Sequence, residues 1–219
     1  MKKITIITGH YGCGKTNFSV NLAVKAAAEG RSAAIVDLDL VNPYFRTADF
    51  RGMFEEKGIK MIAPDFANTN LDVPSIQFDV EQLVRSEDCL IIDVGGDDAG
   101  ATALGRYAEA ISEFSNDIDM LYVFNQRRTL TASADETAVL MYEIEAAARM
   151  KHTALVNNTN LGCETTADII NESAGYAAEI AAKTGLPLAF TTCPEEIAPQ
   201  LSRNDLFPVK IYVKPLWEK

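Results

Sequence analysis

The feature that most limits the fold of this chain is a series of eight short apolar segments, most of them separated by longer amphipathic ones. The apolar segments are β-like and span residues 3–8, 32–38, 59–63, 88–94, 119–125, 152–158, 187–192 and 207–213. Strands that are apolar on both faces are typical of a parallel sheet that helices cover on both sides. The sequence therefore predicts an α/β fold of three layers, αβα, around a mostly parallel sheet of seven or eight strands.

Three of the intervening segments have the spacing of helices. Gly30 and Gly185 follow two of them as C-terminal caps, and Thr165 or Thr166 can cap the start of the last one. The chain has 219 residues and 47% hydrophobic content, enough for a sizeable core, so we expect a single domain over residues 1–219. The expected apolar faces are Phe18, Leu22 and Ala26 in 15–29; Leu140, Ile144 and Ala147 in 131–149; and Ile170, Ala174, Ala177 and Ala181 in 166–183.

Residues 9–16 match the pattern G-x-x-x-x-G-K-[ST] of a phosphate-binding loop. An apolar strand precedes them and an amphipathic helix follows, which is the context that this loop requires. Backbone N–H groups of such a loop point at phosphate oxygens, Lys15 neutralises the β and γ oxygens, and Thr16 offers a hydroxyl to Mg²⁺. The pattern predicts a P-loop NTPase. The expected nucleotide contacts are Gly9, His10, Tyr11, Gly12, Cys13, Gly14, Lys15, Thr16 and Asn17.

Three carboxylates stand at the ends of two other expected strands. Asp37 and Asp39 end the second strand, and Asp93 ends the fourth. Because the carboxyl ends of parallel strands form one ligand edge, these groups should converge near Lys15 and Thr16. Asp93 is expected to hold Mg²⁺ through water, as a Walker B aspartate does.

Gly96 follows Asp93 in the spacing D-x-x-G, which can bring a backbone N–H close to a γ-phosphate. Asp97 and Asp98 come next. Two further carboxylates would overcharge the site, so we expect both of them to stay in solvent.

The segments "IITGHYGCGKT" (6–16) and "VDLDLVNPYF" (36–45) resemble the MinD/ParA-like P-loop ATPases, the CobQ/CobB/MinD/ParA family of the SIMIBI class. That class also holds nitrogenase iron protein, dethiobiotin synthetase and nickel-chaperone GTPases. The pattern reads without gaps over 6–45 and fits later segments more loosely. The resemblance implies ATP/ADP and Mg²⁺ as cofactors. It also implies Lys15 on phosphate and Asp39 on the attacking water as catalytic residues, with Thr16, Asp37 and Asp93 around the metal.

The chain departs from that family at His10, where the family carries a signature lysine. That lysine reaches across a dimer to the phosphates of the partner subunit, whereas a histidine is shorter and mostly neutral at pH 7. A homodimer of this chain is therefore expected not to be lysine-bridged. Arg46, Arg127 or Arg128 could supply the missing positive charge.

The expected sixth strand does not continue as N-K-x-D, the pattern that reads guanine in this class. It continues as Asn157-Asn158-Thr159-Asn160, without the lysine and the aspartate. Asparagine amides can pair with the amine and ring nitrogens of adenine, as the family's strand-end asparagine does, so Asn157 and Asn158 favour ATP. Pro194 and Glu195 resemble the family's second segment at the edge of the base.

The leading functional hypothesis is a Mg²⁺-dependent ATPase that acts as a nucleotide switch for a partner protein. Its nucleotide state would reshape residues 40–50 and 63–75. One alternative is a ligase or kinase that phosphorylates a small anionic molecule bound by Arg127 and Arg128. Others are a nucleotide-binding module with little turnover and a metallochaperone-type NTPase, which two histidines and separated cysteines support weakly.

Composition limits the partners and the location. A formal charge of −11 disfavours nucleic acid and anionic lipid. No apolar run reaches the ~18 residues of a membrane span, and the strand-like tail breaks at Pro215, so Trp217 should pack. We expect a cytoplasmic protein without stable membrane association. Its reduced thiols are Cys13, Cys89, Cys163 and Cys193.

Overall fold

The computed structural model describes residues 1–39, 47–63 and 77–213. The expected switch segments, 40–50 and 63–75, therefore lie largely outside the described residues. Arg46, Pro215 and Trp217 lie wholly outside them.

The centre of the fold is a sheet of eight strands in the order β3-β2-β4-β1-β5-β6-β7-β8, and every neighbouring pair is parallel. This confirms the predicted fold class and places a strand within or overlapping each of the eight apolar segments. The strands are β1 (Ile4–Thr8), β2 (Ala33–Leu38), β3 (Lys60–Ile62), β4 (Cys89–Val94), β5 (Ile118–Phe124), β6 (Ala154–Asn157), β7 (Leu188–Pro194) and β8 (Leu206–Val209). The α-helices of the described residues are α1 (Lys15–Ala28), α2 (Arg51–Glu56), α3 (Val80–Ser86), α4 (Asp98–Gly105), α5 (Ala108–Ser112), α6 (Ala134–Ala148) and α7 (Ala167–Thr184).

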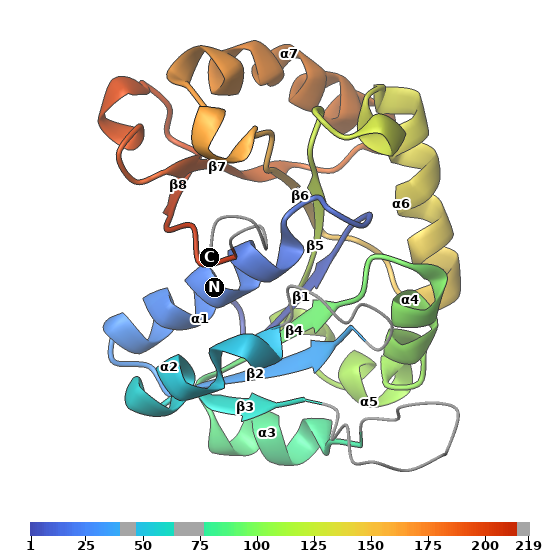
Figure 1. The fold of residues 1–219 in the computed structure, drawn as a ribbon. Coiled ribbons are helices and arrows are strands. Elements are labelled where there is room, and N and C mark those ends of the chain that lie inside the picture. Colours follow the sequence, from blue (N-terminus) through green and yellow to red (C-terminus); the bar gives the residue numbers. More distant parts are fainter. Residues whose placement is uncertain (40–46, 64–76, 214–219) are drawn as a thin grey trace, which may run out of the picture.

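Helices cover both faces of the sheet (Figure 1). Successive side chains of a strand point to opposite faces, and the two faces have separate clusters of buried side chains. On β5, Leu121 and Val123 pack on the face covered by α1 and α2. Tyr122 and Phe124 pack on the other face, which α3 to α7 cover. Burial on both faces explains why the strand segments are apolar throughout.

Helix α1 buries its predicted face. Helix α7 buries half of its predicted face, because Ile170 and Ala177 are buried but Ala174 and Ala181 are only partly buried. The predicted cap residues lie where expected. Phe18, Leu22 and Ala26 of α1 are buried. In α7, Thr166 caps the N-terminus by accepting from the backbone N–H of Ile169, and Gly185 closes the C-terminus at a φ of 71°.

The predicted face of α6 is wrong by one residue. Leu140, Ile144 and Ala147 are only partly buried, whereas the fully buried face contains Ala138, Met141, Glu145 and Ala148. Apolar spacing missed this face because it includes a glutamate. The Glu145 carboxylate can be buried because three hydrogen bonds from the protein satisfy it.

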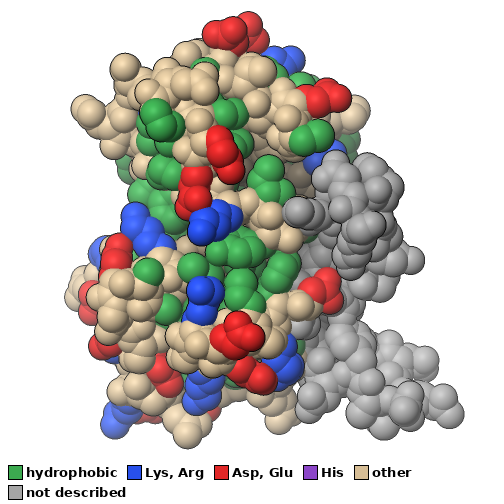
Figure 2. Space-filling view, turned by 60° about the vertical axis from the view of Figure 1, so that its left-hand side comes forward, with side chains coloured by type: hydrophobic (Ala, Val, Ile, Leu, Met, Phe, Trp, Pro, Cys, Tyr) green, Lys and Arg blue, Asp and Glu red, His purple; other side chains and the backbone are tan. Residues whose placement is uncertain are grey.

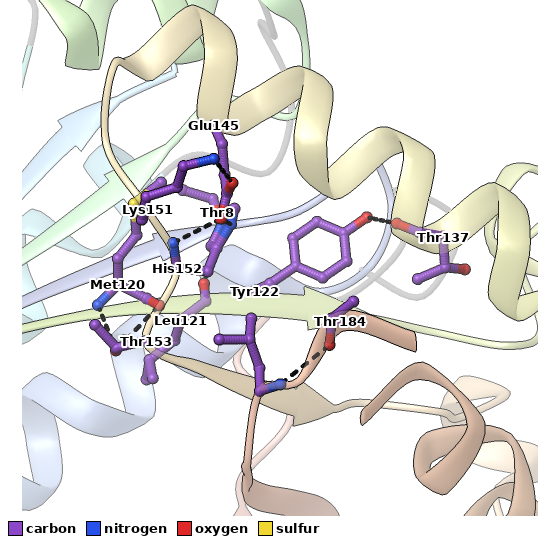
Figure 3. A network of polar contacts seen from close by, with 11 residues as sticks. Thr8, Met120, Leu121, Tyr122, Thr137, Glu145, Lys151, His152, Thr153 and Thr184 are labelled. Atoms are coloured by element: carbon purple, nitrogen blue, oxygen red, sulfur yellow. Dashed lines mark hydrogen bonds and ion pairs between the residues drawn. The ribbon is translucent and has the colours of Figure 1, made fainter. Parts of the chain in front are cut away.

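Those hydrogen bonds belong to a buried network between α6, β1 and the start of β6 (Figure 3). His152 Nε2 lies 2.7 Å from the hydroxyl of Thr8, the last residue of β1, and Nδ1 lies 3.2 Å from Glu145 Oε1. Lys151 Nζ donates to Glu145 Oε2 at 2.6 Å. With Glu145 ionised, Nδ1–H of His152 donates to the carboxylate and Nε2 accepts from Thr8. The network fixes the end of β1 directly before Gly9.

The residues after β8 do not continue the predicted strand to residue 213. They are held against α1 by two asparagines. Asn17 accepts from the backbone N–H of Tyr212 at 2.8 Å, and Asn21 both donates to and accepts from the backbone of Lys210 at 2.9 Å. Tyr212 also packs edge-on against Phe50, with 6.2 Å between ring centroids. This segment therefore joins α1 to the turn before α2.

The surface in Figure 2 mixes both charge signs with hydrophobic side chains and has no continuous basic area on that face. None of the helices in the described residues combines the length and apolarity needed to cross a membrane.

The Glu145 network predicts an acid-sensitive contribution to stability. Burial raises the pKa of Glu145, but hydrogen bonds from His152 and Lys151 outweigh it and lower that pKa to about 2, from an ordinary 4.5. A lowered pKa stabilises the fold fully above pH 4.5, and the contribution is lost as the pH falls towards 2. Glu145→Gln should lower the free energy of unfolding by about 2 kcal/mol at pH 7. The difference from wild type should shrink below about pH 4.5.

Denaturant unfolding at several pH values measures this difference. Glu143→Gln is the matched control, because Glu143 lies on the same helix and is exposed. Equal losses in the two variants, or a Glu145→Gln loss independent of pH, would contradict the assignment.

Candidate functional site

The loop between β1 and α1 wraps through three residues with positive φ. Gly9, Gly12 and Gly14 have φ values of 141°, 76° and 86°. A Cβ atom at Gly9 would lie 2.1 Å from the carbonyl oxygen of Val123, and one at Gly14 would lie 2.2 Å from Nδ2 of Asn158. Glycine is therefore required both by the backbone conformation and by the neighbours of the loop.

Lys15 begins α1 and is 7% exposed. Its Nζ donates to the carbonyl oxygen of His10 at 3.2 Å, so the ammonium group lies inside the loop. Burial lowers the pKa of Lys15, and the charges of Asp93 and Asp39 act in the opposite direction. The loop thus holds a poorly solvated cation that faces two of the predicted carboxylates.

Asp93 lies at the end of β4 and is 1% exposed. Oδ1 accepts from the hydroxyl of Ser19 at 3.0 Å, and Oδ2 accepts from the hydroxyl of Thr47 at 2.7 Å. Burial raises the pKa of Asp93. Hydrogen bonds from Thr47, Thr16 and Ser19 and the charge of Lys15 lower it. The carboxylate therefore joins the first turns of α1 to the turn before α2.

Asp37 and Asp39 lie on the neighbouring strand end. Asp37 is fully buried and is the register partner of Asp93, and its Oδ1 accepts from the backbone N–H of Asp39 at 3.0 Å. A Cβ atom at Gly95 would lie 3.2 Å from Asp39 Oδ1. The structure thus brings Asp37, Asp39 and Asp93 together at the edge that also carries Lys15.

Gly96 brings the β4–α4 loop close to the phosphate-binding loop. A Cβ atom at Gly96 would lie 2.5 Å from the backbone nitrogen of Tyr11 and 2.7 Å from Nζ of Lys15. Asp97 and Asp98, which follow, are exposed, and Asp97 caps α4 by accepting from the N–H of Gly100. The D-x-x-G spacing therefore places Gly96 beside Lys15 and leaves the next two carboxylates outside, as predicted.

The two predicted base-edge asparagines have partners within the protein. The Asn157 amide donates to Ser173 Oγ at 2.8 Å, and its oxygen accepts from the N–H of Thr159 at 3.2 Å. Asn158 donates to the carbonyl oxygen of Cys13 at 2.6 Å and accepts from the hydroxyl of Thr192. Asn158 thus connects the end of β6 to the phosphate-binding loop, and its part in base recognition stays a prediction.

The remaining predicted contacts lie around the loop. Cys13 is fully buried, while Tyr11 is 54% exposed. The Asn17 side chain is bound to segment 210–213, so a nucleotide contact there would come from its backbone. Pro194 ends β7, and Glu195 is exposed, 3.9 Å from Lys210 Nζ. These positions stay predictions for nucleotide contact.

Sequence reasoning missed two hydroxyls that hold Asp93. Ser19 lies three residues after Thr16 on α1, so helical spacing puts both on one face and could have identified it. Thr47 gave no comparable signal, because its contact with Asp93 joins residues 46 positions apart.

The donors at this edge fit a magnesium ion. Thr16, Asp93 and Asp37 offer hydroxyl and carboxylate oxygens, which this hard cation prefers. Within the described residues, no three His, Cys, Asp or Glu side chains form a metal-binding group. Magnesium sites commonly use one or two carboxylates, with phosphates and water supplying the rest. Such a site agrees with the donors present.

Comparison with known proteins supports the fold. No protein-family model matches the chain. An iron-sulfur cluster carrier protein of Saccharolobus solfataricus is 34% identical over 87 residues, covering 34% of this chain and 29% of that protein. The structure of cell division protein FtsY of Thermotoga maritima has a TM-score of 0.61 and 19% identity, covering 96% of this chain and 66% of that one.

The 54 kDa signal recognition particle protein of Aeropyrum pernix, in complex with GDP, has a TM-score of 0.56 and 18% identity. The match covers 87% of this chain and 41% of that one. The chain thus spans less than two thirds of the length of each of these three relatives. The likeness shows that this chain shares the fold of these two proteins, and it does not single out the MinD/ParA group.

The approach of Gly96 to the loop predicts that Gly96→Ala is destabilising. A methyl group there meets backbone atoms of Tyr11, which cannot rotate away. We expect a loss of about 1–3 kcal/mol, typical of overpacking. Thermal or denaturant unfolding measures it.

Gly52→Ala is the matched control, because Gly52 lies in α2 and a Cβ atom there has no neighbour within 4 Å. That change should raise stability by about 0.5 kcal/mol, since alanine favours helix. A Gly96→Ala variant as stable as Gly52→Ala would show that the two loops are not in contact.

Proposed function

We propose that this chain is a Mg²⁺-dependent ATP-binding protein that hydrolyses ATP and acts as a nucleotide switch for a partner protein. The observation that carries the proposal is that the glycine-rich loop, Gly96 and the strand-end carboxylates converge on Lys15. Its buried ammonium lies inside a glycine-rich loop, next to Gly96 and within the influence of Asp93 and Asp39. Phosphate oxygens would accept hydrogen bonds from this ammonium group. They would also accept from the backbone N–H groups of the loop and of the N-terminus of α1.

In this proposal Mg²⁺ would be held by Thr16 and Asp93, with Asp37 in its outer shell. The ion, when bound with nucleotide, neutralises negative charge on the phosphates. Ser19 and Thr47 orient the Asp93 carboxylate through their hydroxyls. Lys15 would bind the β and γ oxygens, and the backbone N–H of Gly96 would donate to the γ-phosphate.

The proposed base is adenine. The support is the sequence Asn157 to Asn160, which lacks the lysine and aspartate of a guanine reader. GDP occupies the signal recognition particle relative, so a direct comparison of the two bases is essential. Pro194 and Glu195 would lie at the base edge.

The proposed switch would act through the elements that Asp93 and α1 contact. Thr47 donates to Asp93, and Phe50 of the same turn packs on Tyr212. Binding of a ligand at Asp93 would therefore change the position of the turn before α2. A partner protein that contacts this turn could then distinguish the nucleotide states. The proposal includes no lysine-bridged homodimer, because His10 occupies the signature position.

The local match to an iron-sulfur cluster carrier favours a second candidate, a carrier of metal clusters. Cys163 is the exposed cysteine of the four, and Cys13, Cys89 and Cys193 are buried. Anaerobic reconstitution with iron and sulfide, followed by absorbance, distinguishes this candidate. A cluster retained by wild type and lost in Cys163→Ser would support it.

Lys15→Ala should abolish measurable ATP binding, a loss on the order of 100-fold or more, because a charged contact to both β and γ oxygens disappears. Titration calorimetry with ATP·Mg²⁺ measures it, and Lys57→Ala, an exposed lysine on the C-terminal side of α2, is the control. Wild type should bind GTP about 10-fold more weakly than ATP. Undiminished binding in Lys15→Ala would exclude the site, and equal affinities would exclude adenine selectivity.

Asp39→Ala should reduce hydrolysis by about 100-fold while ATP affinity stays within a few-fold, because orienting the attacking water matters mainly in the transition state. Phosphate release under single-turnover conditions measures the rate. Asp98→Ala, an exposed carboxylate near the same edge, should leave the rate unchanged. Lost binding with normal turnover would mean that Asp39 holds the metal instead.

A further inference from the structure

Two adjacent arginines follow β5, and their side chains have different surroundings. Arg127 forms an ion pair with Glu172 of α7, with 3.3 Å between Nη2 and Oε2. Arg128 extends to the phosphate-binding loop. A Cβ atom at Gly12 would lie 3.5 Å from its Nε and 3.7 Å from its Cζ. The guanidinium group of Arg128 therefore lies against the middle of the loop.

The turn that carries Arg128 is anchored from inside the protein. The carbonyl oxygen of Asn125, a residue only 1% exposed, accepts from the N–H of Arg128 at 3.1 Å and from the hydroxyl of Thr131 at 2.6 Å. Thr131 N–H donates to the carbonyl oxygen of Arg128 at 3.0 Å, and its hydroxyl lies 3.9 Å from Sγ of Cys13. The turn and the loop are thus in direct contact. Little backbone freedom remains to be lost when Arg128 meets a ligand.

The charge of Arg128 is not neutralised by a carboxylate in the described part of the chain, since no ion pair there includes it. The charge of Arg128 also acts on the loop. Burial raises the pKa of the Cys13 thiol, and the charge of Lys15 and hydrogen bonds with Thr131 and Asn125 lower it. The charge of Arg128 lowers it further. An exposed guanidinium with open donors suits phosphate oxygens, which it can bind through two parallel N–H groups.

The contact of Arg128 with Gly12 indicates which phosphate of a bound nucleotide the guanidinium group can reach. Gly12 follows Tyr11, whose backbone nitrogen is the atom that Gly96 approaches. That side of the loop is where the proposed site places the γ-phosphate. The start of α1, after Gly14, lies further along the loop.

We propose that Arg128 binds the terminal phosphate of the nucleotide held by the 9–16 loop and so supplies, from the same chain, a second positive charge beside Lys15. The inference rests on the proposed nucleotide site and deepens it. It assigns this role to Arg128 rather than to Arg127, because Arg127 forms an ion pair with Glu172. A site completed in this way needs no cation from a second subunit.

The test compares triphosphate and diphosphate binding in three variants. Affinities are measured by titration calorimetry with Mg²⁺ for ADP and a non-hydrolysable ATP analogue, and for GDP and the corresponding GTP analogue. Arg128→Ala should weaken the triphosphate analogue by about 10- to 100-fold and the diphosphate several-fold less. Arg128→Lys should recover part of the loss, because lysine keeps the positive charge but lacks the paired N–H groups of the guanidinium. Arg127→Ala, the matched control, should stay within about two-fold of wild type for both ligands.

A bracing role for Arg128 gives a different result. If its side chain only packs on Gly12, Arg128→Ala should weaken triphosphate and diphosphate equally, lower the melting temperature without nucleotide, and not be rescued by lysine. That outcome, or unchanged affinities for both ligands, would overturn the inference while the nucleotide site stands. Wild type that binds none of the four ligands would overturn the proposed function and this inference together.

Discussion

The parallel pairing of β1 with its two neighbours positions the centre of the candidate site, the phosphate-binding loop and Asp93. Ile7 is the register partner of Asp93 on β4, and Thr8 that of Tyr122 on β5. These pairs set the carboxylate beside the loop and bring Gly9 against the carbonyl of Val123. A slip of one residue in the pairing of β4 with β1 would turn Asp93 to the opposite face, away from α1. The network of Thr8, His152 and Glu145 also holds the end of β1 in this register (Figure 3).

The same edge carries an electrostatic cost that the fold meets with hydroxyl groups. Burying a carboxylate is unfavourable unless it is hydrogen-bonded and paired. Asp93 receives hydrogen bonds from Ser19 and Thr47 as well as the field of Lys15. Because the hydroxyls are neutral, they satisfy the oxygens without cancelling the charge that a cation or a phosphate-bound metal would meet. The arrangement keeps a negative group available at a place where water is scarce.

The strands and the loop could be predicted from the sequence because their signals are local. Apolar runs mark the strands, and the glycine spacing marks a backbone that only glycine can follow. The face of α6 was predicted wrongly because Glu145 is buried through contacts with His152 and Lys151, which apolar spacing cannot indicate. The contacts of Thr47 and Asn158 join distant segments, so no periodicity announces them. Adjacent arginines look alike in sequence, and the difference between Arg127 and Arg128 emerges only when α7 and the loop are placed beside them.

The asparagine contacts between α1 and the residues after β8 have a consequence for biosynthesis. Asn17 and Tyr212 are separated by 195 positions, and β8 pairs with β7 in parallel. Contacts of such separation form slowly, because a long stretch of chain must be closed before they stabilise anything. While the ribosome is still adding residues before 210, the side-chain amides of Asn17 and Asn21 lack these partners and the flank of α1 is open. Helix α1 is synthesised long before the residues that complete its contacts, so a nascent chain exposes this flank to chaperones until residues 210–213 have been added.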